Sequence, residues 1–207
     1  SGTSGTTTTA CGAGLYKAAH NAYYGTSYTC SKVNAGYWNN GGGTNATGSV
    51  ISGKSGGTIA AGRYGAAGAT SDQGSGAVAK GYYSTGGGTS STPTAAGNGC
   101  VSGKSCGKVT AGCYADATGS TSSCPKTCPG LYVNSVAGSD DISDCYFTTK
   151  GGYYIADKTD TALTKCGNKF YCPATTLYYP NVTGDNRKSC PDASSSTDTE
   201  ALADMAW

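Results

Sequence analysis

The sequence predicts a mainly β fold with an elongated repeat architecture of short strands and Gly-rich turns, stapled by disulfides and with little helix. Three observations lead to this prediction. One stretch of the chain occurs twice, Gly and Tyr replace most of the usual aliphatic core, and cysteines are numerous. The 207 residues include 34 Gly, 16 Tyr and 11 Cys. Internal repetition favours units that stack and bury a shared core.

The repeat has four copies. ISGKSGGTIAAGRYGAAGATS begins at Ile51 and VSGKSCGKVTAGCYADATGSTS begins at Val101, while related stretches begin at Lys32 (KVNAGYWNNGGGTN) and Ala77 (AVAKGYYSTGGGTS). Each copy has an aliphatic residue, a Gly three positions later and an aromatic residue five positions after the aliphatic one. The aliphatic residues are Val33, Ile59, Val78 and Val109, the glycines are Gly36, Gly62, Gly81 and Gly112, and the aromatic residues are Trp38, Tyr64, Tyr83 and Tyr114.

The spacing within a copy predicts its local structure. Aliphatic and aromatic residues at an odd separation lie on opposite faces of a regular strand. A bulge at the intervening Gly would return both side chains to one face. We therefore expect short bulged strands, each followed by a Gly/Ser/Thr turn. The four aliphatic residues should be buried, and the four aromatic residues should occupy equivalent positions in successive layers and serve as interface candidates.

Four segments follow one another along the chain. Residues 1–30 form an N-terminal segment with Cys11 and Cys30. Residues 31–123 are the tandem Gly/Tyr repeat, of two units of about 45–50 residues or four half-repeats. Residues 124–190 form a cysteine-rich module, and 191–207 a polar tail. Pairs of neighbouring tyrosines occur along the chain, and in a strand one ring of each pair can face outward.

The cysteines indicate an oxidising compartment, because such numbers are rare in reducing ones. Cys106 and Cys113 distinguish the second long copy from the first, so a local bridge between them is the simplest pairing. The alternative is that each pairs elsewhere, since sequence alone does not give connectivity. The odd total leaves one thiol unpaired. The remaining disulfide candidates are Cys11, Cys30, Cys124, Cys128, Cys145, Cys166, Cys172 and Cys190, with Cys100 as the eleventh cysteine.

Catalytic, metal and cofactor motifs are weak, and we expect no catalytic residue, no bound metal and no cofactor. Gly48-x4-Gly53-Lys54-Ser55 matches a phosphate-binding loop formally, but a strand and a helix should flank such a loop. The following Ser-Gly-Gly-Thr has poor helix propensity. His20 is the only histidine, and no nucleophile motif accompanies it. Asp140, Asp141 and Asp144 lack the spacing of a known calcium loop.

Partners and modifications follow from charge and hydropathy. The net charge is +2 and the basic residues are scattered, which argues against nucleic acid as a binding partner. The start at Ser1 indicates a mature or trimmed product, and no stretch has the length of a membrane span. Asn45 and Asn181 begin N-glycosylation sequons. The thin core of residues 31–99 predicts self-association, in a homo-oligomer or filament whose contacts bury aromatic residues of the repeat.

Parts of the chain resemble ephrin-receptor-like cysteine-rich modules with CPxGxY-type repeats. The resemblance is carried by CPGLYVN at Cys128, SDCYFTT at Ser143 and FYCPATTLYYP at Phe170. AGRYGAAGATS at Ala61 is similar to another part of those repeats, without the cysteines. The resemblance covers roughly residues 31–190. It implies an extracellular, disulfide-stapled, largely β protein of the kind that long surface proteins carry in arrays.

These observations favour one class of function. We expect a non-catalytic structural or adhesive protein at the cell surface or outside the cell, either a surface repeat protein or the subunit of a surface filament. The alternative is a carbohydrate-binding module that stacks glycans on exposed Tyr faces. A secreted hydrolase is a third class.

Overall fold

The computed structural model describes residues 10–22, 25–93, 99–180 and 187–190. The prediction of a mainly β, disulfide-stapled fold with little helix is confirmed. The described chain contains short strands and a single helical turn, η1 (Ile142–Asp144). Two compact units divide it: unit 1 comprises Ser1–Lys108 and Ala117–Ser123, and unit 2 comprises Val109–Asp116 and Cys124–Trp207. This division falls inside the 31–123 segment that the sequence treats as one repeat.

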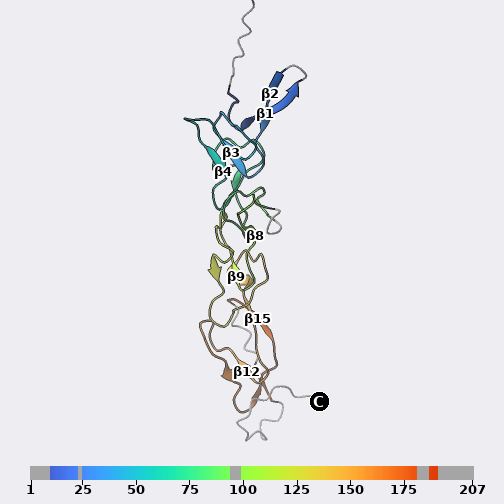
Figure 1. The fold of residues 1–207 in the computed structure, drawn as a ribbon. Helices are drawn as coiled ribbons and strands as arrows, with labels where there is room; N and C mark the ends of the chain where they lie inside the picture. The colour runs from blue at the N-terminus through green and yellow to red at the C-terminus, as the bar shows by residue number, and fades with distance from the viewer. Residues whose placement is uncertain (1–9, 23–24, 94–98, 181–186, 191–207) are drawn as a thin grey trace, which may run out of the picture. The chain divides into compact units, whose positions relative to one another are not determined.

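Among its described residues, unit 1 has four antiparallel hairpins made from strands that follow one another in the sequence. Figure 1 labels both strands of the first two of these hairpins. The first hairpin is long, with eight residues in each strand, and the other three are short. The pairs are β1 (Leu15–Ala22) with β2 (Gly25–Lys32), β3 (Tyr37–Asn39) with β4 (Gly56–Thr58), β5 (Arg63–Tyr64) with β6 (Gly76–Ala77), and β7 (Tyr82–Ser84) with β8 (Cys106–Lys108).

In the described part of unit 2 there are also four antiparallel pairs, two of which join strands that are not adjacent in the sequence. All of its strands have two or three residues. The pairs are β9 (Cys113–Tyr114) with β10 (Lys126–Thr127), β11 (Tyr146–Thr148) with β15 (Thr176–Tyr178), β12 (Tyr153–Tyr154) with β13 (Thr164–Lys165), and β14 (Phe170–Tyr171) with β16 (Lys188–Ser189).

The aliphatic residue that begins each copy, called here the lead residue, is buried as predicted. Val33, Val78 and Val109 are 0% exposed and Ile59 is 1% exposed. Each lead residue comes directly after the second strand of a hairpin. The small core therefore forms where one hairpin ends and the next copy begins.

The predicted bulged strand is wrong, because the Gly of each copy lies in a turn before the strand. Gly36 has a φ of +82°, and the Tyr37 N–H donates to the Asn34 carbonyl over 3.2 Å. This is the geometry of a type II turn, which needs a left-handed residue at its third position. The strand starts after the turn. The separation of three and five residues thus reflects a turn followed by a strand, and not one irregular strand.

Backbone hydrogen bonds connect successive copies in a repeating register. In unit 1 the N–H of each lead residue donates to the turn residue of the copy before it: Val33 to Gly14 over 3.0 Å, Ile59 to Gly36 over 2.9 Å, and Val78 to Gly62 over 3.0 Å. Unit 2 uses the same register, with Cys128 bonded to Gly112 and Cys166 to Gly152, each over 3.0 Å, and Cys190 bonded to Lys169 over 2.9 Å.

This register contains more copies than the sequence pattern found. Cysteine or threonine takes the lead position where the pattern required Val or Ile. Cysteine packs like a small apolar residue, which explains why it can replace valine there. Cys128, Cys166 and Cys190 of unit 2 donate in this register. Cys11 of unit 1 and Thr149 of unit 2 are the buried lead residues of copies whose turn residues, Gly14 and Gly152, accept in it.

The turn glycines of unit 1 touch the loop of the copy two places further along. A Cβ on Gly36 would lie 2.5 Å from the Gly87 carbonyl oxygen and 2.6 Å from Val101 Cγ1. A Cβ on Gly14 or Gly62 would clash with the carbonyl oxygen of Gly68 or Gly119. Glycine is therefore required at this position for two reasons, the left-handed φ and the close backbone approach.

Five disulfides staple the units, and the predicted pairing of Cys106 with Cys113 is wrong. Cys106 lies on β8, which pairs with β7 in unit 1, whereas Cys113 lies on β9, which pairs with β10 in unit 2. The two cysteines therefore belong to different hairpins. Cys190 forms no disulfide in the described part of the chain. The bridges are Cys11–Cys30, Cys100–Cys106, Cys113–Cys124, Cys128–Cys145 and Cys166–Cys172.

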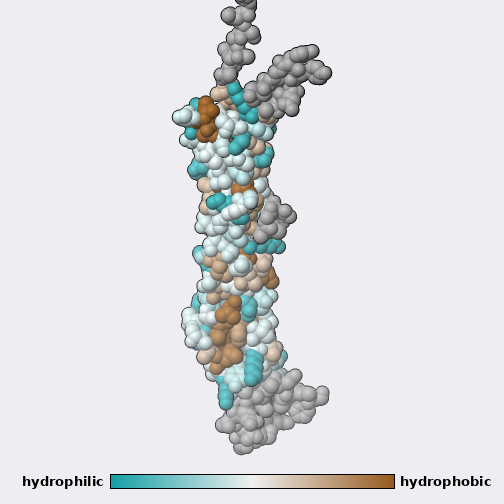
Figure 2. All heavy atoms as spheres, in the orientation of Figure 1, coloured by the Kyte–Doolittle hydropathy of each residue, from teal (hydrophilic) through white to brown (hydrophobic). Residues whose placement is uncertain are grey.

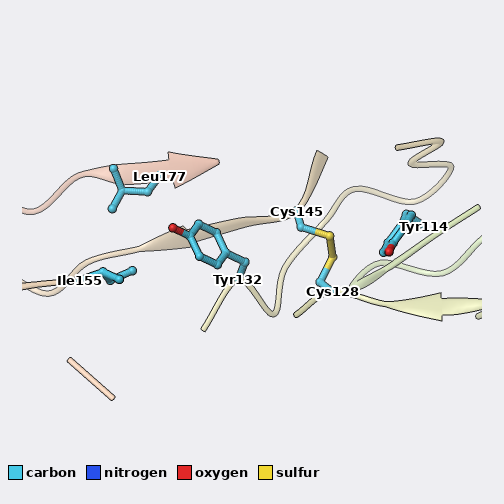
Figure 3. Packing of buried hydrophobic residues seen from close by; sticks show 6 residues of the cluster. All are labelled: Tyr114, Cys128, Tyr132, Cys145, Ile155 and Leu177. Carbon is cyan, nitrogen blue, oxygen red and sulfur yellow. A yellow bond between two sulfur atoms is a disulfide. The ribbon is translucent and has the colours of Figure 1, made fainter. Parts of the chain in front are cut away.

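Unit 2 has an apolar core around Tyr132, which is 0% exposed (Figure 3). Its ring lies between the Cys128–Cys145 disulfide and the side chains of Ile155 and Leu177. The Tyr132 hydroxyl is buried and has no hydrogen-bond partner among the described residues. Burial, followed by the charges of Tyr179 and two aspartates, raises the pKa of this phenol. The core thus contains one polar group that folding leaves unsatisfied.

Candidate interaction surface

The four interface candidates occupy equivalent positions, as the repeat predicts. Trp38, Tyr64 and Tyr83 lie on β3, β5 and β7 of unit 1 and form parallel bridges to Ala69, Gly88 and Ser120 in the loops of the next copies. All three are half-buried. Tyr114 on β9 of unit 2 is 8% exposed and belongs to the core around Tyr132. It is therefore a core residue, and unit 1 carries the partly accessible aromatic row.

A glycine lies across the hairpin from each aromatic residue of this row. Trp38 pairs with Gly57, Tyr64 with Gly76, and Tyr83 with Gly107. A Cβ at Gly57 or Gly107 would have no atom within 4 Å, so space is open beside both glycines. The residue directly paired with each ring therefore has no side chain. We call Trp38, Tyr64 and Tyr83 the aromatic row.

The corresponding rings of unit 2 have cationic neighbours instead. Lys126 lies opposite Tyr114, with its ammonium 5.8 Å from the ring centroid and 2.7 Å from Asp116 Oδ2. The hydrogen bond to Asp116 raises the pKa of Lys126. The Arg187 guanidinium lies 4.3 Å from the centroid of Tyr154 and donates to its hydroxyl over 3.3 Å. Cation–π contacts of this kind cover ring faces, and among the described residues none is made to the aromatic row.

The loop at Gly42 is the exposed member of a set of equivalent loops in unit 1. In the loop around Gly87, Val101 is covered by the turn at Gly36 and is 9% exposed. Ile51 takes the place of Val101 in the loop around Gly42 and packs on Gly42 in the same way. It is 45% exposed. Figure 2 shows apolar atoms gathered on this part of unit 1, next to β3 and β4.

Two acidic turns of unit 2 are closed by their own hydrogen bonds. The Asp144 carboxylate accepts from the N–H groups of Asp140 and Asp141, over 2.9 and 3.2 Å. Asp157 accepts from the side chain and backbone of Thr159, and these bonds hold its pKa below the ordinary range. In the described residues, no group of three or more His, Cys, Asp or Glu is placed to hold a metal ion. The carboxylates therefore act as caps of these turns.

The remaining sequence motifs fall in turns and strands. The segment that matches a phosphate-binding loop forms a turn in which the Lys54 N–H donates to the Ile51 carbonyl over 3.2 Å, and β4 follows it instead of a helix. His20 lies on β1 opposite Ser27, and its side chain lies outside the described set. Among the described residues, no helix is long and apolar enough to cross a membrane.

One of the two sequons, at Asn45, lies among the described residues. Asn45 is exposed in the loop that follows β3. Its Oδ1 accepts from the N–H and hydroxyl of Thr47, over 3.1 and 3.0 Å, and its Nδ2 donates to Ser49 Oγ over 2.9 Å. Asn181 lies outside the described residues. Asn45 is thus an accessible amide whose orientation is set by its own sequon.

Comparison with family models, curated proteins and solved structures finds no match to this chain. The candidate site therefore rests on its geometry. That geometry offers a row of half-buried rings beside bare glycines and an exposed isoleucine at a repeat position that is covered elsewhere. Partly accessible aromatic rings of this kind are enriched where proteins contact other molecules.

Proposed function

We propose that this chain is a non-catalytic extracellular structural protein that associates with further copies of itself, as a surface repeat protein or a subunit of a surface filament. Five disulfides support an oxidising location, because such bonds persist outside reducing compartments. The resemblance of residues 31–190 to extracellular cysteine-rich repeats supports the same location. The repeated backbone register supports a structural role, since it builds layers instead of a pocket.

The exposure of Ile51 is the observation that carries self-association. Ile51 is 45% exposed. Val101 occupies the equivalent position, is covered by a glycine turn and is 9% exposed. A glycine turn of a second protein chain would bury Ile51 in the way that the turn at Gly36 buries Val101 within unit 1. Such a heterologous contact need not close on itself, and it can therefore build an open array.

Sedimentation velocity over a range of protein concentrations tests the proposal. The unchanged chain should form larger species as concentration rises, and Ile51→Asp should shift that transition to higher concentration by at least about tenfold, the effect of about 1.4 kcal/mol. Val136→Asp is the matched control, because Val136 is 65% exposed and lies in unit 2. Replacing Trp38 and Tyr83 with Ala should weaken association more than replacing Tyr178. A chain that stays monomeric at high concentration contradicts the proposal.

The aromatic row favours a second candidate, a carbohydrate-binding surface. Sugars stack their apolar faces on aromatic rings, and the residue paired with each ring of the row is a glycine, which has no side chain. Glycan-array binding by the monomer tests this candidate. Binding should be lost in Trp38→Ala and retained in Ile51→Asp, which separates it from self-association. Absence of binding to all glycans would remove it.

A further inference from the structure

Two tyrosines of unit 2 face each other across a strand pair. Tyr146 on β11 lies directly opposite Tyr178 on β15, and their ring centroids are 5.6 Å apart at an interplanar angle of 45°. This separation is within the range of about 4.5–7 Å in which aromatic rings touch. Tyr178 is 51% exposed and Tyr146 is half-buried. The two phenols are therefore in contact with each other and accessible to solvent.

We propose that Tyr146 and Tyr178 form an oxidative coupling site, at which a one-electron oxidant of the peroxidase class converts the pair to dityrosine. Each phenol loses one electron and one proton to give a phenoxyl radical, whose unpaired electron is shared with the ring carbons ortho to oxygen. A bond forms between one ortho carbon of each ring. Each of these carbons then loses its hydrogen as a proton while a phenol O–H is restored. Overall the pair loses two electrons and two protons, which reduce one hydrogen peroxide to two waters.

A second pair of tyrosines in unit 2 has similar spacing but a buried phenol. Tyr132 and Tyr179 have almost the same centroid separation, 5.5 Å, but meet edge to face at 87°. Tyr132 is 0% exposed and its hydroxyl is enclosed by the core. An oxidant at the surface cannot reach this phenol, and its burial also disfavours loss of the phenolic proton, as its raised pKa reflects. Proximity alone therefore does not make a coupling site, and accessibility distinguishes the two pairs.

The coupled rings would link β11 to β15 covalently, and no disulfide among the described residues joins these two strands. β11 and β15 are far apart in the sequence and are held by three residue pairs, with Thr148 Oγ1 and Thr176 Oγ1 3.1 Å apart at the other end. A link between Tyr146 and Tyr178 would close the intervening chain into a loop and restrict the unfolded state, as a disulfide does. Unlike a disulfide, this carbon–carbon bond resists reducing agents.

To test the proposal, the full-length chain with intact disulfides is treated in dilute solution with a peroxidase and hydrogen peroxide. The products are then reduced, digested and analysed by dityrosine fluorescence and mass spectrometry. We expect a linked peptide joining Tyr146 and Tyr178, in chains that remain monomers and at a rate independent of protein concentration. Intramolecular coupling should dominate at micromolar concentration, because residues held together have effective concentrations of roughly millimolar. Tyr178→Phe and Tyr146→Phe should each reduce the monomer's dityrosine by about tenfold or more.

Tyr171→Phe is the matched control. Tyr171 is also half-buried and lies on β14, which pairs with β16 in unit 2. This substitution should leave the yield unchanged. Far-ultraviolet circular dichroism before oxidation verifies that each variant is folded. Linked peptides that map to other tyrosines, an undiminished yield in Tyr178→Phe, or dityrosine found only between chains would each overturn the proposal.

Discussion

Replacing Gly36 with alanine perturbs the contact on which the repeated register depends. The residue has a φ of +82° in a turn of unit 1 and lies against the loop around Gly87. Alanine at a left-handed position costs about 1–2 kcal/mol. Its Cβ would also lie 2.5 Å from the Gly87 oxygen and 2.6 Å from Val101 Cγ1, and overpacking of this kind costs roughly 1–3 kcal/mol. We expect Gly36→Ala to lower the free energy of unfolding by about 2–5 kcal/mol.

Gly53→Ala separates the two contributions. Gly53 has a φ of +78° in a turn of the same type, but a Cβ at this position would have no atom within 4 Å. It should therefore lose only the left-handed contribution, about 1–2 kcal/mol. Guanidinium unfolding with intact disulfides, followed by circular dichroism and tyrosine fluorescence, measures both variants. Equal destabilisation by the two substitutions would refute the close approach between copies.

Three further predictions concern other parts of the chain. Tyr132→Phe removes the unsatisfied hydroxyl from the core, and it should raise the free energy of unfolding by about 1–3 kcal/mol in denaturant titrations. The raised pKa of Tyr132 means that the folded state favours the neutral phenol. Ionisation of this phenol therefore leaves the free energy of unfolding unchanged below the ordinary tyrosine pKa of about 10, and lowers it as pH rises from there through the folded value. The phenylalanine variant should therefore lose less stability in alkali than the unchanged chain. Lys169→Gly relieves a non-glycine φ of +69° and should stabilise unit 2 by about 1 kcal/mol in thermal melts. Peptide mapping without reduction should recover Cys106 linked to Cys100, and a Cys106–Cys113 peptide would contradict the hairpin assignment.

The sequence predicted the parts of the fold that depend on local pattern. Val33, Ile59 and Val78 recur at a fixed distance from a glycine, and this recurrence identifies the buried positions. The abundance of glycine and threonine predicted little helix. Pattern alone did not distinguish a turn followed by a strand from a bulged strand, because both place the Gly three residues after the lead residue.

The sequence did not reveal features that depend on contacts between copies. Lead residues such as Cys11 and Thr149 escape a search for Val or Ile, although an aromatic residue five positions later was an available signal. Asn39 is 0% exposed, and its side chain accepts from the Gly14 and Gly41 N–H groups. Its buried role follows from copies stacking in space, and nothing local in the sequence marks it. Disulfide pairing also depends on which hairpin contains each cysteine.

Self-association is the central claim, and negative-stain electron microscopy of the concentrated, unmodified chain tests it most directly. The exposed Ile51 position and the covered Val101 position predict linear arrays of repeating subunits, which Ile51→Asp should shorten or abolish while Val136→Asp leaves them intact. Discrete monomers at every concentration, identical for the unchanged chain and Ile51→Asp, would contradict self-association and favour the carbohydrate-binding surface.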